Sequence, residues 1–154
     1  MSKFRFRMAT LLRIREATRD DRRAQLAEAY AAEQKLNEQK AELLAEADQL
    51  RRQYASSATP GTLDVDTLLN AHRFQLVLGA QLQLLEDQAA KLAVEIEKRR
   101  QILVAADRDV RVLENLRETW KQRHRQEEQY VEMKQLDEVA GRIRANLDSA
   151  ERSA

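Results

Sequence analysis

The sequence predicts an all-α fold: a long two-helix antiparallel coiled coil, or helical hairpin, whose second helix overhangs the first at its C-terminal end. Three observations predict it. Ala, Leu, Glu, Lys, Arg and Gln dominate a composition that is 43% hydrophobic, 34% charged and 5% aromatic, as in long helices. The one proline and one of the three glycines, the main helix breakers, fall together at Pro60 and Gly61. On both sides of them, side chains recur at the alternating three- and four-residue spacing of a coiled-coil seam.

The first helix is predicted from about Lys3 to residue 55. Toward the N-terminus its stripe meets three arginines, Arg22, Arg19 and Arg15. Arginine stems can pack against a partner helix while the guanidinium groups reach water, so we expect a locally loose seam there. The alternative is that these arginines face another protein. The other members of this stripe are Met8, Leu12, Leu26, Ala29, Glu33, Leu36, Lys40, Leu43, Ala47, Leu50 and Tyr54.

A loop is predicted over residues 56–63, and the second helix over about 64–148. Asp64 or Thr62 can cap this helix, and Asp66 favours its positive N-terminal end. We treat the 154 residues as one domain. The second stripe consists of Leu68, Ala71, Gln75, Leu78, Leu82, Leu85, Ala89, Leu92, Ile96, Arg99, Leu103, Ala106, Val110 and Leu113, and the pattern resumes at Leu136, Ala140, Ile143 and Leu147.

The register follows from the position of the turn. A short loop favours an antiparallel hairpin, and folding back at Pro60 places residue i opposite roughly residue 120 − i. Phe4 then lies near Leu116, and the helix after about Trp120 has no partner. We expect the large apolar groups of this overhang to be uncovered; they are Trp120, Tyr130, Met133 and Leu136. The alternative is that they pack in a dimer or curl back.

Sequence signatures of an enzyme are absent. There is no phosphate-binding G-x-x-x-x-G-K-[ST] loop, no dinucleotide-binding G-x-G-x-x-G turn and no cysteine. His124 with Glu127 and Glu128 has the spacing of metal ligands on one helix, but a solvated polar face is the simpler interpretation. We therefore expect no catalytic residue, no cofactor, no metal and no small-molecule substrate.

The charge balance argues against nucleic acid as a partner. The net charge is +1, which gives no general attraction to a polyanion. Residues 4–23 are rich in arginine, as a basic zipper region would be. Here, however, a turn and a longer return helix follow, which suits a self-paired hairpin better. No run of about 18 apolar residues, the length that would span a membrane, occurs.

Two segments are more specific than a generic coiled coil. The first is residues 4–16, FRFRMATLLRIRE. The second comprises residues 113–118, LENLRE, followed by residues 126–140, QEEQYVEMKQLDEVA. Together with the chain length and the loop position, they resemble the FliJ family of bacterial flagellar export proteins. The resemblance covers essentially the whole chain.

The resemblance implies a non-enzymatic part of the flagellar type III export apparatus, similar in fold to the central stalk subunit of rotary ATPases. Three kinds of partner are implied: the hexameric export ATPase, the cytoplasmic domain of the export gate, and export chaperones. The implied location is the cytoplasm, at the inner face of the cell membrane at the flagellar base. A stalk protein of a virulence type III secretion system is the first alternative, and a plain homodimeric coiled-coil scaffold is the second.

The resemblance also suggests where the partners bind. Family members direct their paired helix ends at the ATPase ring, and they place a gate-binding surface on the first half of the second helix. The positions that match the gate surface are Phe74 and Leu78, although Gln81 and Leu85 depart from the family pattern. The predicted ATPase-binding residues are Phe4, Phe6, Arg7, Leu11, Arg13, Arg15, Arg19, Trp120, Tyr130, Met133, Leu136 and Asp137.

Overall fold

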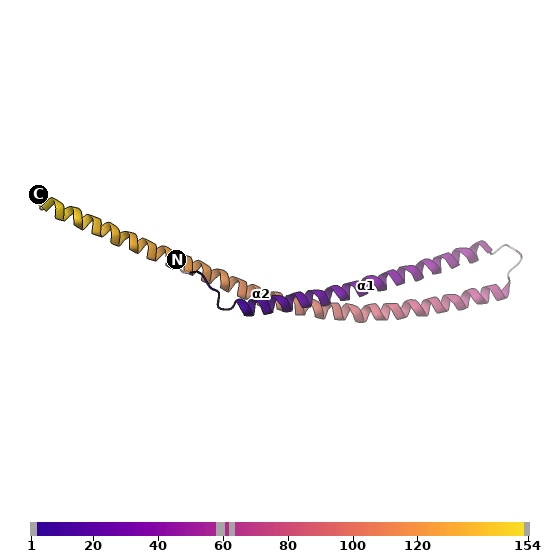
Figure 1. The fold of residues 1–154 in the computed structure, drawn as a ribbon. Coiled ribbons are helices and arrows are strands. Elements are labelled where there is room, and N and C mark those ends of the chain that lie inside the picture. The colour runs from indigo at the N-terminus through magenta and orange to yellow at the C-terminus, as the bar shows by residue number, and fades with distance from the viewer. Residues whose placement is uncertain (1–2, 58–60, 62–63, 153–154) are drawn as a thin grey trace. The chain divides into compact units, whose positions relative to one another are not determined.

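The structure, a computed structural model that describes residues 3–57, 61 and 64–152, consists of two long helices that pack against each other (Figure 1). Helix α1 spans Ala9–Ser57 and helix α2 spans Val65–Arg152. No strand occurs within these described ranges. The predicted fold class, an all-α helical hairpin, is confirmed.

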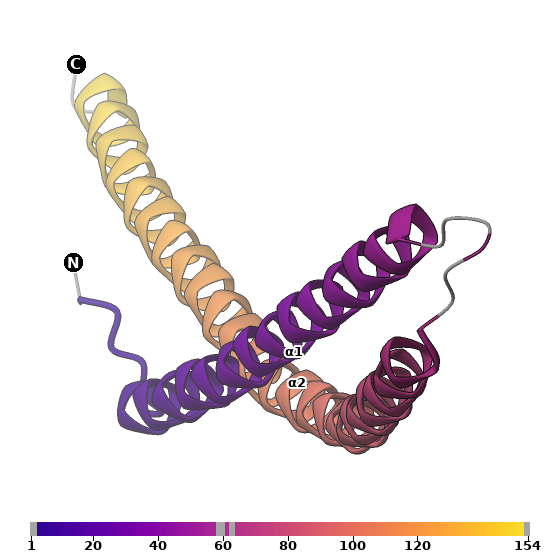
Figure 2. The same cartoon turned by 90° about the vertical axis from the view of Figure 1, so that its right-hand side faces the viewer.

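Helix α1 begins at Ala9, later than the predicted start near Lys3. Residues 3–6 have no regular secondary structure and a turn follows at Arg7 and Met8; the chain before α1 is drawn as a plain coil in Figure 2. Phe4 and Phe6 are half-buried, whereas Lys3 and Arg5 are exposed. Side chains two residues apart share a face in an extended chain but not in a helix, so this alternation allows both aromatic rings to face α2. The Phe6 carbonyl accepts the Ala9 amide at 3.3 Å, which fixes the turn into the helix.

The two helix ends at the loop also differ from the prediction. Helix α1 continues to Ser57, where the Ser56 and Ser57 hydroxyls each donate to the Gln53 carbonyl at 2.8 Å. Gly61 has a φ of 118°, a left-handed conformation that favours glycine. Residues 58–60 and 62–63, which include Pro60 and the possible cap Thr62, lie outside the described residues.

Asp64 caps α2. Its carboxylate accepts the Asp66 amide at 3.2 Å and the Thr67 hydroxyl at 2.8 Å. The Asp64 carbonyl accepts the first helical hydrogen bond, from the Leu68 amide at 3.2 Å. This arrangement satisfies amide donors that a helix start otherwise leaves without partners. At its other end α2 reaches Arg152, a few residues beyond the predicted end.

The chain divides into two compact units, which we describe separately. The terminal unit comprises Met1–Ala17 with Asp107–Ala154, and the hairpin unit comprises Thr18–Ala106. Both helices contribute residues to each unit. The prediction of a single domain stays a prediction.

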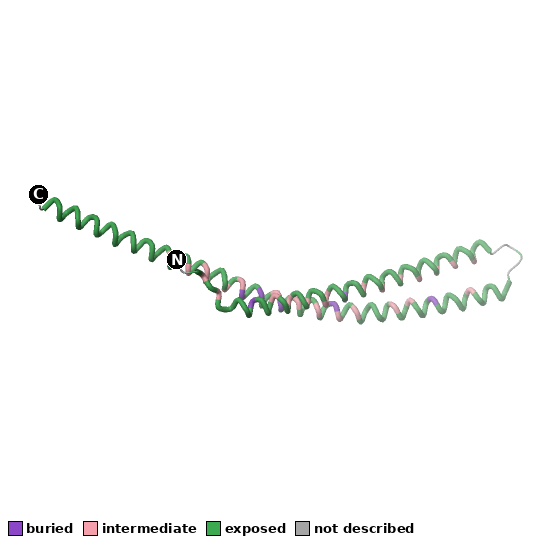
Figure 3. The backbone as a smooth tube through the Cα atoms, viewed as in Figure 1, coloured by how far each residue is buried: buried purple, intermediate pink, exposed green. Residues whose placement is uncertain are grey.

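In the hairpin unit the two helices run antiparallel. Arg99 donates a hydrogen bond to the Gln25 carbonyl, and Lys40 pairs with Glu86 at 3.1 Å. Both partners lie several residues later on α2 than predicted. From Leu26 to Tyr54, every predicted seam residue of α1 is buried or half-buried. On α2 the predicted seam holds except at three exposed positions, which are Leu68, Gln75 and Ala89 (Figure 3).

In the terminal unit the core is a small apolar cluster. Leu12, Val110 and Leu113 are buried, with Val110 only 1% exposed, and Phe6 packs against them. Arg15 and Asp109 form an exposed ion pair at 3.3 Å beside this cluster. Beyond Glu128, every described residue of α2 is exposed (Figure 3). The predicted overhang therefore exists, but it starts later than Trp120.

Candidate functional site

The N-terminal segment contacts α2 through two aromatic rings, those of Phe4 and Phe6. We call these two contacts the clasp. The Phe6 ring meets Trp120 edge-on, with centroids 5.5 Å apart and planes at 70°. The Phe4 ring lies against His124, with centroids 5.7 Å apart and planes at 39°. Edge-on and tilted geometries are those that aromatic pairs prefer. Two aromatic contacts therefore hold an extended segment that has no regular secondary structure.

Two predictions about this region are wrong. Trp120 is half-buried rather than uncovered, and Phe4 lies at His124 rather than near Leu116. Both errors have one physical cause. An extended chain advances about 3.3 Å per residue, against 1.5 Å in a helix. The segment before Ala9 therefore reaches much farther along α2 than a helical segment of the same length.

A basic, partly aromatic cavity of about 300 Å³ lies beside the clasp, lined by residues of the N-terminal segment and of α2. Three of the lining residues, Lys3, Arg5 and Arg123, are cationic at neutral pH, and Glu127 is the one carboxylate. The His124 Nε2 lies 3.5 Å from the Glu128 carboxylate, a contact that becomes an ion pair when the imidazole is protonated. The cavity suits an acidic protein surface. Its remaining lining residues are Phe4, Trp120 and His124.

The arginines of the predicted loose seam make contacts inside their own units. Arg19 and Arg22 are half-buried; Arg19 contacts Asp20 at 3.2 Å, and Arg22 donates to the Gln25 side chain at 3.1 Å. Arg15 pairs with Asp109 across the helices. The expectation of a locally loose seam, and its alternative that these arginines face another protein, stay predictions. Arg7 and Arg13, by contrast, are exposed.

The exposed part of α2, residues 129–152, carries the remaining predicted site residues. Tyr130 is 70% exposed, Met133 62% and Leu136 68%, and Asp137 is also exposed. Contiguous exposed apolar side chains of this kind mark interaction surfaces in soluble proteins. The structure thus brings Phe4, Phe6 and Trp120 together in one cluster, and it leaves the later residues uncovered on the same helix.

The two predicted gate-binding residues differ in burial. Phe74 is 39% exposed, whereas Leu78 is only 4% exposed. A partner that docks on this unit can touch Phe74 directly, while Leu78 belongs to the seam. The roles of both residues stay predictions.

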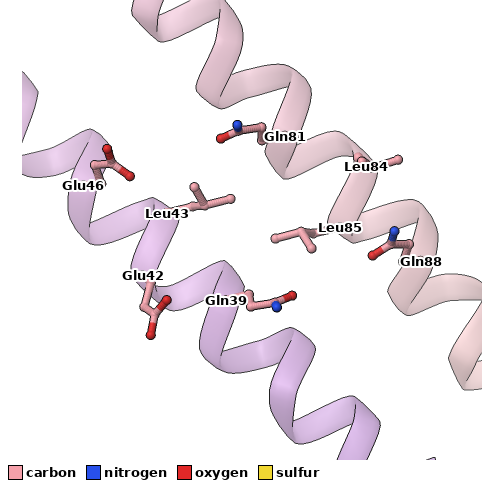
Figure 4. Close-up of a pocket in the computed structure, with 8 residues that line it drawn as sticks. All are labelled: Gln39, Glu42, Leu43, Glu46, Gln81, Leu84, Leu85 and Gln88. Carbon is pink, nitrogen blue, oxygen red and sulfur yellow. The ribbon is translucent and has the colours of Figure 1, made fainter.

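A cavity of about 380 Å³, which the seam spacing does not predict, lies between α1 and α2 in the hairpin unit. In Figure 4, Leu43 and Leu85 point toward each other across it. Seam spacing identified both leucines, but spacing alone does not report how far apart two helices stand. Glutamines at the lining positions are the one sequence signal of looser packing. The full lining is Gln39, Glu42, Leu43, Glu46, Gln81, Leu84, Leu85 and Gln88.

The fold and the exposed helix end define the class of protein, a helical-hairpin coiled coil with an uncovered terminal helix. Within the described residues, no helix is long and apolar enough to cross a membrane. No group of His, Cys, Asp and Glu side chains in those same ranges is arranged to hold a metal ion.

Comparison with known proteins identifies the family. The family model described as flagellar FliJ protein matches residues 4–146. The chain belongs to the FliJ family and is a flagellar export-related protein. No curated protein and no solved structure matches it.

Proposed function

We propose that this chain is a non-catalytic coupling protein of flagellar type III export that binds the hexameric export ATPase in the manner of a central stalk. The observation that carries the proposal is the terminal unit. It joins a basic aromatic clasp to the last part of α2, residues 129–152, in which every residue is exposed. Family membership supplies the export context.

The chemistry of this unit suits a protein partner. An apolar centre within a polar rim is the usual anatomy of a protein–protein interface. Met133 and Leu136 are the anchors that a partner can reach without displacing anything. Trp120 and Phe6 already contact each other, so we assign them the role of holding the N-terminal segment in place beside those anchors.

The decisive experiment is binding of the full-length chain to the cognate export ATPase, measured by pull-down and by stimulation of ATP hydrolysis. Leu136→Gln should weaken binding by about thirtyfold, the effect of losing one hot-spot side chain. Leu76→Gln is the matched control, because Leu76 is 61% exposed on the same helix in the other unit. Failure of the wild-type chain to bind at micromolar concentration would contradict the proposal.

We further propose that Phe74 contacts the cytoplasmic domain of the export gate and that export chaperones bind this chain. The partial exposure of Phe74 supports the gate contact. A peripheral position at the inner membrane face would follow from gate binding. Phe74→Ala should reduce recovery of the gate domain in a pull-down and should leave ATPase binding intact. If Phe74→Ala reduced binding of the gate domain and of the ATPase equally, the two partners would not bind separate surfaces.

A further inference from the structure

The uncovered part of α2 carries a regular heptad pattern of its own. Six of its apolar residues recur at alternating three- and four-residue spacing over three heptads, and all six are exposed. A pattern of this regularity is the signature of a helix that packs against another helix. We call these residues the terminal stripe; they are Met133, Leu136, Ala140, Ile143, Leu147 and Ala150.

The terminal stripe is not a continuation of the face that the N-terminal segment covers. Leu136 follows Trp120 by 16 residues, about 4.4 helical turns, which places it roughly 160° around the helix axis from Trp120. His124 and Ala140 have the same relation. An N-terminal segment that continued along the same face of α2 would therefore not cover the terminal stripe. The stripe needs a different partner.

We infer that the terminal stripe pairs with the same stripe of a second copy of this chain, in antiparallel orientation. In that arrangement Met133 meets Ala150 of the second copy, Leu136 meets Leu147, and Ala140 meets Ile143. In two of these pairs a large side chain meets an alanine, and in the third two leucines meet. A two-fold axis repeats each of these layers, as a closed symmetric dimer requires.

The flanking charges select the antiparallel orientation. Asp137 and Arg144 occupy the same heptad position, next to the core, and antiparallel pairing brings Asp137 of each copy to Arg144 of the other. Both side chains are exposed and available. Parallel pairing would instead set Glu132 against Asp137, a pair of like charges, which is unfavourable.

The same charges fix the register. A shift by one heptad in one direction places Asp137 against Asp137 of the second copy, and a shift in the other direction places Arg144 against Arg144. One antiparallel register alone therefore gives opposite charges at these positions. Residues 129–152 carry four basic and five acidic side chains, so the net charge of −1 per copy gives little overall repulsion between two copies.

This inference does not rest on the proposed ATPase binding, because it concerns this chain alone. The two are related through Met133, Leu136 and Asp137, which would serve both contacts. A self-paired chain would then have to separate before it binds another protein through this face, so self-pairing would regulate access to it.

The test is the mass of the full-length chain in sedimentation equilibrium between micromolar and millimolar concentration. Wild-type protein should pass from monomer to dimer as its concentration rises. Leu136→Gln should keep the chain monomeric, while the control Leu76→Gln should behave as wild type. A monomer at every concentration overturns the inference and assigns the stripe to a different protein.

Charge reversal tests the orientation. Asp137→Arg and Arg144→Asp should each weaken self-association by about tenfold, because two attractive pairs become repulsive. An equimolar mixture of the two variants should recover a dimer, since every flanking pair in the mixed dimer is attractive. The double variant should also recover it. If neither the mixture nor the double variant recovers the dimer, antiparallel pairing is wrong.

Discussion

The Phe6 ring and the indole of Trp120 pack in a T-shaped arrangement, at a centroid distance of 5.5 Å. This contact joins an extended N-terminal residue to the middle of α2, far away in sequence. Together with Phe4 on His124, it replaces the helical start that the sequence pattern predicts.

We expect Trp120→Ala to release the N-terminal segment while leaving helix content nearly unchanged. The lost aromatic contact and burial should cost about 2 kcal/mol locally. Trypsin should then cut after Arg5 and Arg7 faster than in the wild type, with far-UV circular dichroism almost constant. Phe74→Ala is the control with no change at these sites. A large loss of helix in Trp120→Ala would instead make Trp120 a residue on which the whole fold depends.

Two adjacent leucines should differ sharply in their contribution to stability. Leu12 is 4% exposed in the cluster with Val110, whereas Leu11 is 40% exposed. Leu12→Ala should lower the free energy of unfolding by about 3 kcal/mol, and Leu11→Ala by less than about 1 kcal/mol. Urea denaturation measures both values. Similar losses of unfolding free energy in the two variants would contradict the assignment of the buried cluster to the face of α1 that carries Leu12.

Glycine replacements should change stability in opposite directions at two positions. A Cβ at Gly79 would meet no atom within 4 Å, so Gly79→Ala should stabilise α2 by about 1 kcal/mol. At Gly61 the space is equally open, but φ is 118°, and Gly61→Ala should destabilise the turn by about 1 kcal/mol. Thermal unfolding of the two variants measures both changes in stability. A stabilised Gly61→Ala variant would contradict the left-handed turn.

The exposed ion pairs should matter little. Lys40 and Glu86 are 41% and 52% exposed at their side chains, and water screens such pairs. Glu86→Gln should lower the free energy of unfolding by at most about 1 kcal/mol, with the difference vanishing in high salt. A loss that persists in high salt would mean that Glu86 acts through packing rather than charge.

Local spacing explains which parts of the fold the sequence predicts. From Leu26 to Tyr54 the seam could be identified residue by residue, because burial along a paired helix repeats with the heptad. The clasp at Phe4 and Phe6 could not, because a segment with a turn at Arg7 and Met8 lacks helical periodicity. The same limit applies to the cavity at Leu43 and Leu85, since the separation of two helices depends on side chains from both.

At the candidate site, the sequence predicts the identity of the apolar anchors better than their surroundings. Tyr130, Met133 and Leu136 are exposed as expected. The sequence pattern places Trp120 with them, because antiparallel pairing of a helical N-terminus would end before Trp120. Trp120 is covered because an extended chain reaches farther along α2 than a helix does. Neither composition nor charge pattern predicts that reach.

The continuity of α2 has a consequence for how its last quarter folds. Starting a helix is the costly step, whereas adding residues to an existing helix is nearly neutral. The packed turns around Val110 and Leu113 therefore act as a preformed template from which residues 129–152 extend, across Gly141. Cut away as a peptide, the same residues would lose that template and much of their helix. The terminal stripe is thus a surface that exists only while the chain behind it is folded.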